Sequence, residues 1–363
     1  MPAFCFYVSD YGLGHAARSI ALIRKILSRF PRSRIFVKSD GPYDLLVRSF
    51  SDPRVAVIRC RNDVCVPLLP DTDAVNADRT RDLVLGWMES WNSYVAEEVR
   101  FCTGHSVDMI ISDISPQPFL VASDLGIPSL AVSNFSWDTI YHHLFPGMSG
   151  AIDTMRSAYA KATLACVLPF HVPMDAFPRK VPVSILARDI TTPRDAMREQ
   201  LGFSENDTVV FFNPRDSYDR PDENLLTLAT RHSLKVLMPS GFPAVRDRII
   251  PLPADETESQ NWIGMCDCVV TRCGYSTVSE AVQAKIPLVV WERPGFIEDS
   301  AIASVIRDLG IGKVLDYTTI RSLGWIAELP GIHRYKQHYE QTDPKYVNNG
   351  SNDILSHLQE FIA

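Results

Sequence analysis

Short apolar runs alternate with longer amphipathic stretches along most of the chain. In the first half, the apolar runs that we interpret as strands cover residues 3–8, 34–37, 55–58, 109–112 and 129–132. Helical periodicity lies between them, near residues 16–30, 77–102 and 117–124. This alternation is typical of a parallel sheet covered by helices, so it predicts one doubly wound α/β unit.

The alternation resumes after a stretch rich in proline. A sixth run, 165–169, leads into prolines that we expect to prevent regular structure over residues 170–184. Later strands are predicted at 208–212, 234–238, 248–252, 268–271 and 288–291, and helices at 258–264, 276–284 and 298–308. We therefore predict two Rossmann-like domains facing a cleft, 1–170 and 192–363, joined by a linker at 171–191. We also expect the last helix to pack back on the first domain.

Composition narrows the class of protein. The 363 residues are 46% apolar and 22% charged, as in a globular protein, and 36 basic against 43 acidic residues give a net charge of -7. This balance argues against a nucleic-acid partner. Eight scattered cysteines predict free thiols, and the absence of a leader or an integral membrane segment predicts a cytoplasmic protein. Peripheral membrane contact is left open.

The loop after the first predicted strand, "SDYGLGHAARS", is the first candidate site. Gly12 and Gly14 allow close backbone approach, and the positive end of the following helix would disfavour the cationic form of His15. A neutral histidine is what a general base requires. Arg18, about one turn further on, is positioned for an anion or for a surface carboxylate. The alternative is a simple turn that His15 caps.

Asp113 follows a buried strand in the same half, "MIISDIS", where it could face the opening loop. A carboxylate that binds one imidazole nitrogen fixes the tautomer and stabilises the imidazolium. The alternative role is that of a helix N-cap, for which aspartate is equally suited.

The segment "TRCGYSTVSEAVQAKIPLVVWERPGFIEDS" is the most informative. A strand ends at Arg272, Gly274 makes a turn, and Ser276 and Thr277 open a helix, so hydroxyls, backbone N–H groups and a helix N-terminus converge as a phosphate site. Arg272 could add a fixed positive charge to it. Ordinary helix capping would explain each residue singly.

Three acidic residues extend the same site. Glu280 lies one turn into the helix, where it could bind a ribose, and Glu298 and Asp299 open the next helix, where they could hold sugar hydroxyls. Taken alone, each is equally consistent with a solvated helix charge or a favourable residue of the first turn.

These motifs resemble the GT-B nucleotide-sugar glycosyltransferases. The segment just quoted is similar to the donor-binding segment of the lipid-linked N-acetylglucosaminyltransferase of peptidoglycan synthesis and of plant small-molecule glycosyltransferases. "GLGHAAR", "SNFSWDTIY" and "RDAMREQLGF" resemble the glycosyltransferase-like N-terminal region of plant L-arabinokinases.

The resemblance implies a role for each matched residue. His15 matches the catalytic base and Asp113 its supporting acid. Gly274, Ser276 and Thr277 match the residues that bind the donor diphosphate. Glu280 matches the residue that binds the ribose, and Glu298 and Asp299 match those that bind the sugar.

The sequence also departs from the family pattern. Arg272 replaces a histidine, Cys273 replaces a glycine and Asp299 replaces a glutamine. The loop "NPRDSYDR" lacks the Gly-Ser pair that contacts the phosphate in the family, and Arg215 could supply that contact instead.

The resemblance predicts an inverting, metal-independent glycosyltransferase that needs no cofactor besides a nucleoside diphosphate sugar, with UDP-sugar the expected donor. The acceptor is not identified, although Asn134 and Trp137 are acceptor-side candidates. The alternatives are a nucleotide-sugar epimerase or hydrolase, and a non-catalytic regulator that binds a nucleotide sugar.

Two further features come from the long segment between residues 61 and 77. We interpret "DTD", residues 71–73, as a solvated loop and not as a metal-nucleotide motif, because no strand ends beside it. The segment as a whole is long enough to act as a lid over an acceptor.

Overall fold

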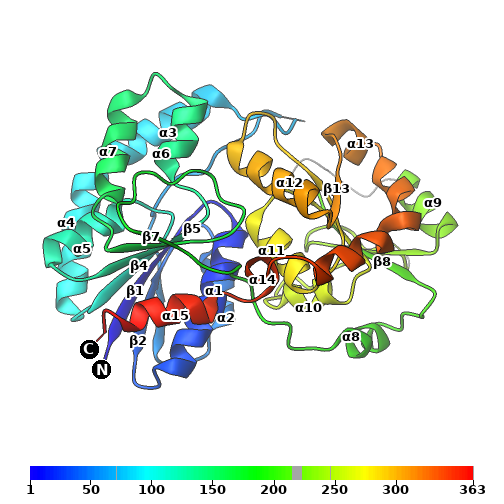
Figure 1. Ribbon diagram of the computed structural model, residues 1–363, viewed down its shortest axis with the longest axis horizontal. Helices are drawn as coiled ribbons and strands as arrows, with labels where there is room; N and C mark the ends of the chain where they lie inside the picture. Colours follow the sequence, from blue (N-terminus) through cyan, green and yellow to red (C-terminus); the bar gives the residue numbers. More distant parts are fainter. Residues whose placement is uncertain (71, 215–222, 246, 363) are drawn as a thin grey trace.

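The computed structural model describes residues 1–70, 72–214, 223–245 and 247–362. Two parallel sheets lie side by side, the first on the left of Figure 1 and the second on the right. The first has the order β3-β2-β1-β4-β5-β6-β7, with β1 Ala3–Val8, β2 Arg34–Lys38, β3 Val55–Ile58, β4 Met109–Asp113, β5 Ser129–Ser133, β6 Leu164–Val167 and β7 Lys180–Pro182. The second has the order β10-β9-β8-β11-β12-β13, with β8 Thr208–Asn213, β9 Leu234–Met238, β10 Ile249–Pro251, β11 Cys268–Arg272, β12 Leu288–Trp291 and β13 Gly312–Val314. Two doubly wound sheets confirm the predicted α/β architecture.

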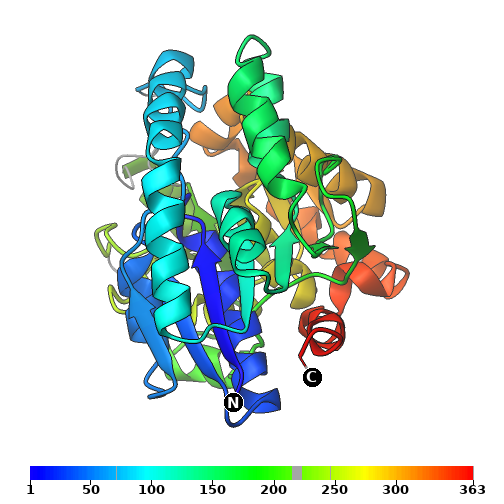
Figure 2. The same ribbon diagram turned by 90° about the vertical axis from the view of Figure 1, so that its left-hand side faces the viewer.

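Helices cover both faces of the first sheet (Figures 1 and 2). Side chains of α1 pack with Phe4, Phe6 and Val8, whereas those of α4 and α5 pack with Cys5 and Tyr7, as the alternation of a strand requires. The helices of this half are α1 Leu13–Arg29, α2 Tyr43–Ser49, α3 Ala77–Glu89, α4 Trp91–Gly104, α5 Gln117–Leu125, α6 Trp137–Leu144 and α7 Ser149–Tyr159.

The second sheet is covered in the same way, with α10, α11 and α12 on one face and α9, α13 and η2 on the other. These helices and the remaining ones are α8 Arg194–Gln200, α9 Glu223–Arg231, α10 Ser259–Gly264, α11 Tyr275–Gln283, α12 Ile297–Leu309, α13 Tyr317–Arg321, the 3-10 helix η2 Gly324–Glu340, α14 Pro344–Val347 and α15 Ser351–Gln359. One apolar core contains side chains of both α1 and α11, so the two domains are joined by packing as well as by the linker.

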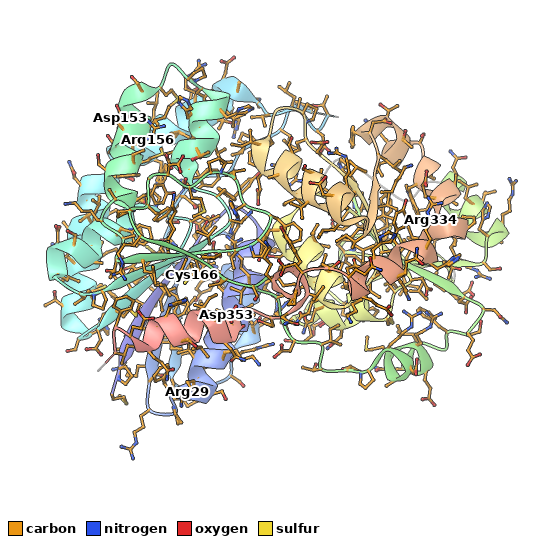
Figure 3. The ribbon with its side chains drawn as sticks, in the orientation of Figure 1. Arg29, Asp153, Arg156, Cys166, Arg334 and Asp353 are labelled. Carbon is orange, nitrogen blue, oxygen red and sulfur yellow. The ribbon has the colours of Figure 1, made fainter. Side chains whose placement is uncertain are left out.

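The last helix, α15, lies against α1 of the first domain (Figure 1). Ile354 and Leu358 are buried in the same apolar core as Leu22 of α1. Figure 3 shows Asp353 on α15, and its carboxylate accepts a hydrogen bond from the backbone N–H of Ser184 at 3.0 Å. The C-terminal segment therefore returns to the domain in which the chain begins.

Two local predictions were wrong, and several elements, among them α2, α6 and α7, were not predicted. Strand β7 lies inside the segment expected to lack regular structure, and β13 was not predicted. The single helix expected at 77–102 is two helices, α3 and α4, which meet at Ser90.

The strand order determines where a ligand can bind. Crossovers leave β1 and β4 adjacent in the first sheet, and β8 and β11 adjacent in the second. The loops after these strands open at the carboxyl edge of each sheet, at the point where the strand order reverses. Val8, the last residue of β1, pairs with Asp113 in the register, so β4 ends beside the strand end from which the chain continues into the Gly12–Gly14 turn.

Candidate active site

A cavity of about 690 Å³ lies between the domains. It is lined by the loop after β1 and the start of α1 on one side, and by the loop after β11 and the start of α11 on the other. Most of the predicted site residues line it: Gly12, Gly14, His15, Arg18, Arg272, Gly274, Ser276, Thr277, Glu280 and Glu298. This volume is within the usual range for a site that binds one ligand of moderate size.

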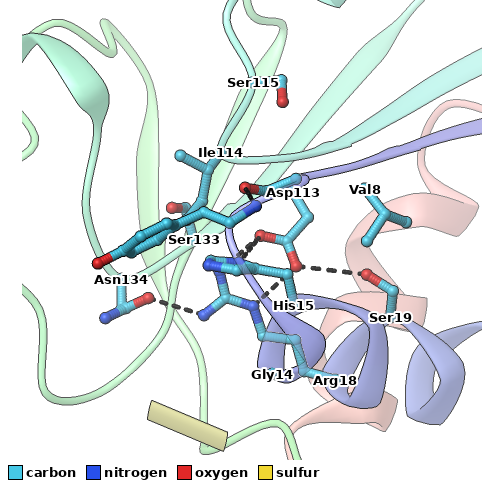
Figure 4. A network of polar contacts seen from close by, with 12 residues as sticks. Val8, Gly14, His15, Arg18, Ser19, Asp113, Ile114, Ser115, Ser133 and Asn134 are labelled. Carbon is cyan, nitrogen blue, oxygen red and sulfur yellow. Dashed lines mark hydrogen bonds and ion pairs between the residues drawn. The ribbon is translucent and has the colours of Figure 1, made fainter. Parts of the chain in front are cut away.

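His15 and Asp113 form a buried pair at the edge of this cavity (Figure 4). The imidazole Nδ1 lies 3.0 Å from Asp113 Oδ1, and the two side chains are 10% and 5% exposed. No hydrogen-bond partner for His15 Nε2 occurs in the part of the chain that the structure describes. The positive φ of Gly12, 91°, turns the chain out of β1 so that His15 enters α1 at its first turn.

Arg18 binds the same carboxylate from the next turn of α1. Its Nε donates to Asp113 Oδ2 at 2.8 Å and its Nη2 to Oδ1 at 2.5 Å, which is a two-pronged contact. Burial alone would raise the pKa of Asp113, but the charges and hydrogen bonds of Arg18 and His15 lower it to about 2. Asp113 is therefore ionised at neutral pH, and the charge of Arg18 is compensated inside the protein instead of facing a ligand anion.

Asn134 connects this group to the second domain. Its Oδ1 accepts from Arg18 Nη1 at 2.7 Å, and its Nδ2 donates to Glu298 Oε1 at 2.8 Å. Asn134 is fully buried and does not line the cavity, whereas Glu298 does. Burial, followed by the nearby Asp299, raises the pKa of Glu298.

The start of α11 contributes the predicted phosphate site. Gly274, Ser276 and Thr277 line the cavity, and α11 begins at Tyr275 with its free backbone N–H groups at this end. Ser276 Oγ already donates a hydrogen bond to the Gly14 carbonyl oxygen at 2.5 Å. The hydroxyl therefore joins the two domains directly, and its role toward a phosphate stays a prediction.

Arg272, the last residue of β11, lies just before that helix start. It is 6% exposed, and its Nε has no hydrogen-bond partner among the described residues. The ion pair that the structure gives it is a long one, 3.9 Å to Asp299 Oδ2. A buried arginine whose closest ion pair among the described residues is this long fits a site for a negatively charged ligand. Arg215, predicted to act on the same ligand, lies outside the described residues.

Glu280 is held by a residue that the sequence analysis missed. Arg188 Nε donates to Glu280 Oε1 at 2.8 Å, and both side chains are 4% exposed. Arg188 also donates to the hydroxyl of Ser259 at 2.8 Å and to the carbonyl of Thr257. It lies in the predicted linker, where no local pattern indicates a contact with a helix so far along the chain.

Asp299 does not line the cavity. It is fully buried, and both its oxygens accept from Arg293: Oδ2 from Nε at 2.9 Å and Oδ1 from Nη2 at 2.6 Å. Arg293, also missed from the sequence, lines the cavity and donates to the Tyr11 hydroxyl. In this pair the arginine faces the cavity and the predicted sugar-binding acid supports it.

Trp137, predicted as an acceptor-side candidate, does not line the cavity and is not available to stack on a ligand. It is fully buried, its Nε1 donates to Asp63 Oδ2 at 3.0 Å, and its ring stacks on Tyr141 with centroids 5.0 Å apart. Tyr11, in the cavity wall, packs edge-on against Trp137, with ring centroids 5.5 Å apart. Its ring centroid lies 6.3 Å from that of Phe296 in the second domain. The Tyr11 ring centroid in turn lies 6.2 Å from that of His15, so this aromatic group reaches the base.

The "DTD" segment is not solvated at Asp73, which corrects that prediction; Asp71 lies outside the described residues. Asp73 is 4% exposed and accepts a hydrogen bond from Trp291 Nε1 at 2.5 Å. Burial raises the pKa of Asp73. Because Trp291 ends β12, the loop that contains Asp73 reaches from the first domain to the second.

The remaining structural expectations concern metals, membranes and thiols. Within residues 1–70, 72–214, 223–245 and 247–362, no group of three His, Cys, Asp or Glu side chains could hold a metal ion. No helix in those ranges has both the length and the apolar character needed to cross a membrane. All eight cysteines are unpaired.

Comparison with known proteins supports the resemblance noted in the sequence. No protein-family model matches the chain. The L-arabinokinase of Arabidopsis thaliana is 27% identical to this chain over an alignment of 380 residues. The alignment covers 99% of this chain and 34% of the kinase. The chain thus spans about a third of the length of the curated relative it matches, and the similarity to L-arabinokinase is confirmed.

Solved structures with a similar fold include several glycosyltransferases. The glycotransferase of kitacinnamycin matches with a TM-score of 0.67 at 13% identity over 100% of both chains. UGT2 of Phytolacca americana, solved with UDP-2-fluoro-glucose and pterostilbene, matches with a TM-score of 0.64 at 14% identity over 99% of both chains. The UDP-glucose:anthocyanidin 3-O-glucosyltransferase, solved with UDP, matches with 0.67 at 12% identity over 99% of this chain and 98% of its own. The chain therefore has the GT-B fold, with two Rossmann-like domains around a cleft.

Proposed function

We propose that the protein is an inverting glycosyltransferase that uses a nucleoside diphosphate sugar. The observation that carries this is the His15–Asp113 pair at the edge of a cavity whose opposite wall is the N-terminus of α11. A base with its orienting carboxylate and a site for a leaving diphosphate thus face one space. The GT-B fold and neighbours solved with UDP or with thymidine diphosphate support a nucleoside diphosphate sugar as the donor, and a UDP-sugar is our specific proposal.

The reaction is a direct displacement. His15 Nε2 takes the proton of an acceptor hydroxyl while the acceptor oxygen forms a bond to the anomeric carbon of the sugar. The bond from that carbon to the diphosphate oxygen breaks on the opposite face, and the diphosphate leaves with the electron pair, so the configuration inverts. The N–H groups of α11 and the charge of Arg272 stabilise the departing diphosphate without a metal ion.

Two measurements test the proposal in sequence. The first is a thermal-shift panel of nucleoside diphosphates and their sugars, since a ligand at a hundred times its dissociation constant adds about 2.7 kcal/mol of stability. The second is release of the nucleoside diphosphate with and without candidate acceptors, compared between the wild type and His15→Ala. We expect His15→Ala to bind the nucleotide normally and to lose about 10²–10⁴-fold in turnover.

The outcomes separate this function from its alternatives. Release that needs no acceptor would indicate a hydrolase, and conversion of the sugar without release would indicate an epimerase. Nucleotide binding without turnover of any kind would indicate a regulator. Wild-type turnover by His15→Ala would exclude the histidine as the base.

A further inference from the structure

Two groups compete for one nitrogen of His15 (Figure 4). Nδ1 lies 3.0 Å from Asp113 Oδ1 and 3.0 Å from Arg18 Nη2. If Nδ1 carries a proton, it donates to Asp113 and leaves Nε2 with a free lone pair that can act as a base. If Nδ1 is bare, it accepts from Arg18, and Nε2–H becomes a donor that cannot take a proton.

The geometry of Arg18 favours the first arrangement. Its Nε and Nη2 bind the two oxygens of Asp113 as a fork, so the carboxylate is fixed in orientation and ionised. An ionised carboxylate can only accept hydrogen bonds, and Asp113 Oδ1 is turned toward His15 Nδ1. The proton of a neutral His15 is therefore best held on Nδ1, between the ring and Asp113.

The fork also supplies the charge that a buried carboxylate needs. Arg18 is 1% exposed, and Nε, Nη1 and Nη2 each have a partner within the protein. Without this guanidinium, Asp113 would have His15 as its nearest source of positive charge. A buried carboxylate would then draw a second proton onto the imidazole, and a doubly protonated imidazole is no base.

Besides Asp113 and Arg18, an acid of the second domain bears on His15. Glu298, at the start of α12, interacts electrostatically with the imidazole, while the rings of Tyr11 and Phe135 flank it without charge. Asn134 binds both Arg18 and Glu298, one through its carbonyl oxygen and one through its amide nitrogen. The polar chain thus runs from the base across the domain boundary to an acid in the wall of the cavity.

We propose that Arg18 is a positioning residue that holds His15 as the neutral Nδ1–H tautomer through Asp113, and that Asn134 extends this control to Glu298. This rests on the proposed function in so far as His15 acts as the base. Neither residue touches the reacting atoms. A donor bound against Glu298 would act on the base through Asn134 and Arg18.

The test reads the imidazole itself and needs no substrate. Nitrogen-15 spectra of histidine-labelled protein, with the His15 resonances assigned by their loss in His15→Gln, report tautomer and protonation as the pH is varied. In the wild type at pH 7 we expect a neutral ring with the proton on Nδ1. In Arg18→Met we expect a doubly protonated ring at pH 7, with the midpoint of its titration moved to higher pH.

Arg24→Met is the matched control, because Arg24 is another arginine of α1 with a two-pronged carboxylate contact, to Glu258, away from the pair. It should leave the His15 titration unchanged. If Arg18→Met does not fold, Arg18→Lys, which keeps the charge but not the fork, should give a neutral ring with mixed tautomers. A wild-type ring with its proton on Nε2, or an Arg18→Met titration like that of the wild type, would overturn the proposal.

Turnover and nucleotide titration complete the experiment. Arg18→Met should lose about 10²-fold or more in kcat/KM at pH 7 and recover part of it as the pH rises, which a purely structural defect would not do. Adding nucleoside diphosphate sugar should shift the His15 resonance in the wild type and not in Asn134→Ala; an equal shift in both would remove Asn134 from the proposal. If the ring behaves as expected and no sugar is transferred, the glycosyltransferase function fails and the positioning role stands.

Discussion

Ser276 and Gly14 are in direct contact across the cleft: the serine Oγ donates to the glycine carbonyl oxygen at 2.5 Å. The contact leaves little room at Gly14, because a Cβ on that residue would lie 3.2 Å from the same Oγ. The turn that leads to His15 and the helix start predicted to hold the diphosphate therefore touch. A ligand that binds the hydroxyl of Ser276 must share or replace this interdomain hydrogen bond.

Ser276→Ala should weaken nucleotide binding. A hydrogen bond to a charged group is worth about 1.5–3 kcal/mol, so we expect the dissociation constant of the preferred nucleoside diphosphate to rise about 10-fold or more. Isothermal titration calorimetry measures it directly. Ser279→Ala is the control, because Ser279 lies on the same helix but donates to the Ser276 carbonyl and does not line the cavity. Equal affinity in wild type and Ser276→Ala would remove the hydroxyl from the phosphate site.

Most of the fold could be predicted because its signals are local. Buried parallel strands have short apolar runs, and those runs coincide with β1, β9 and β12. Strand β7 was missed because it ends in Pro182, and proline in a strand is confined to positions such as an edge, where β7 lies. The break between α3 and α4 was missed because no glycine or proline marks Ser90.

The site was predictable only where the chemistry lies beside a strand end. His15 and Asp113 follow adjacent strands, so the topology alone brings them together. Arg188 and Arg293 depend on side-chain packing between segments far apart in the sequence, which leaves no local pattern. The burial of Asp73 depends in the same way on Trp291, more than two hundred residues away in the chain.

The low pKa of Asp113 predicts a specific acid dependence of stability. Its value of about 2 in the folded protein lies below the ordinary 3.8, so the carboxylate stabilises the fold above pH 4, and this contribution is lost as the pH falls through 2. The difference corresponds to about 2 kcal/mol. Urea unfolding between pH 5 and pH 2 should therefore show a steeper loss of free energy in the wild type than in Asp113→Asn. Parallel curves would contradict the buried ion pair.

Glu280→Gln should reduce discrimination at the ribose. The amide keeps an oxygen that can accept from Arg188 Nε, so the buried contact survives, but the negative charge offered to ribose hydroxyls is lost. We expect the wild type to bind a ribonucleoside diphosphate about 10-fold or more tightly than its 2′,3′-dideoxy analogue, and Glu280→Gln to lessen that ratio. The two dissociation constants, measured for both proteins, give the answer. An unchanged ratio would mean that Glu280 serves only to hold Arg188.

Phe296→Ala should enlarge the space beside the base at a cost in stability. Phe296 is fully buried, packs 6.3 Å from the Tyr11 ring, and carries the Arg293 guanidinium 3.6 Å above its own ring. Truncating a buried phenylalanine costs about 3–5 kcal/mol, which urea unfolding would measure. Phe296 packs on Tyr11, and Tyr11 packs on His15, so if the proposed acceptor approaches His15 past Tyr11, the variant should favour bulkier acceptors. The ratio of kcat/KM for a two-ring phenol to that for a monosaccharide should rise relative to the wild type. Phe296→Leu, which retains most of the volume, should leave this ratio nearly unchanged, and equal ratios in all three proteins would show that these rings do not limit the acceptor.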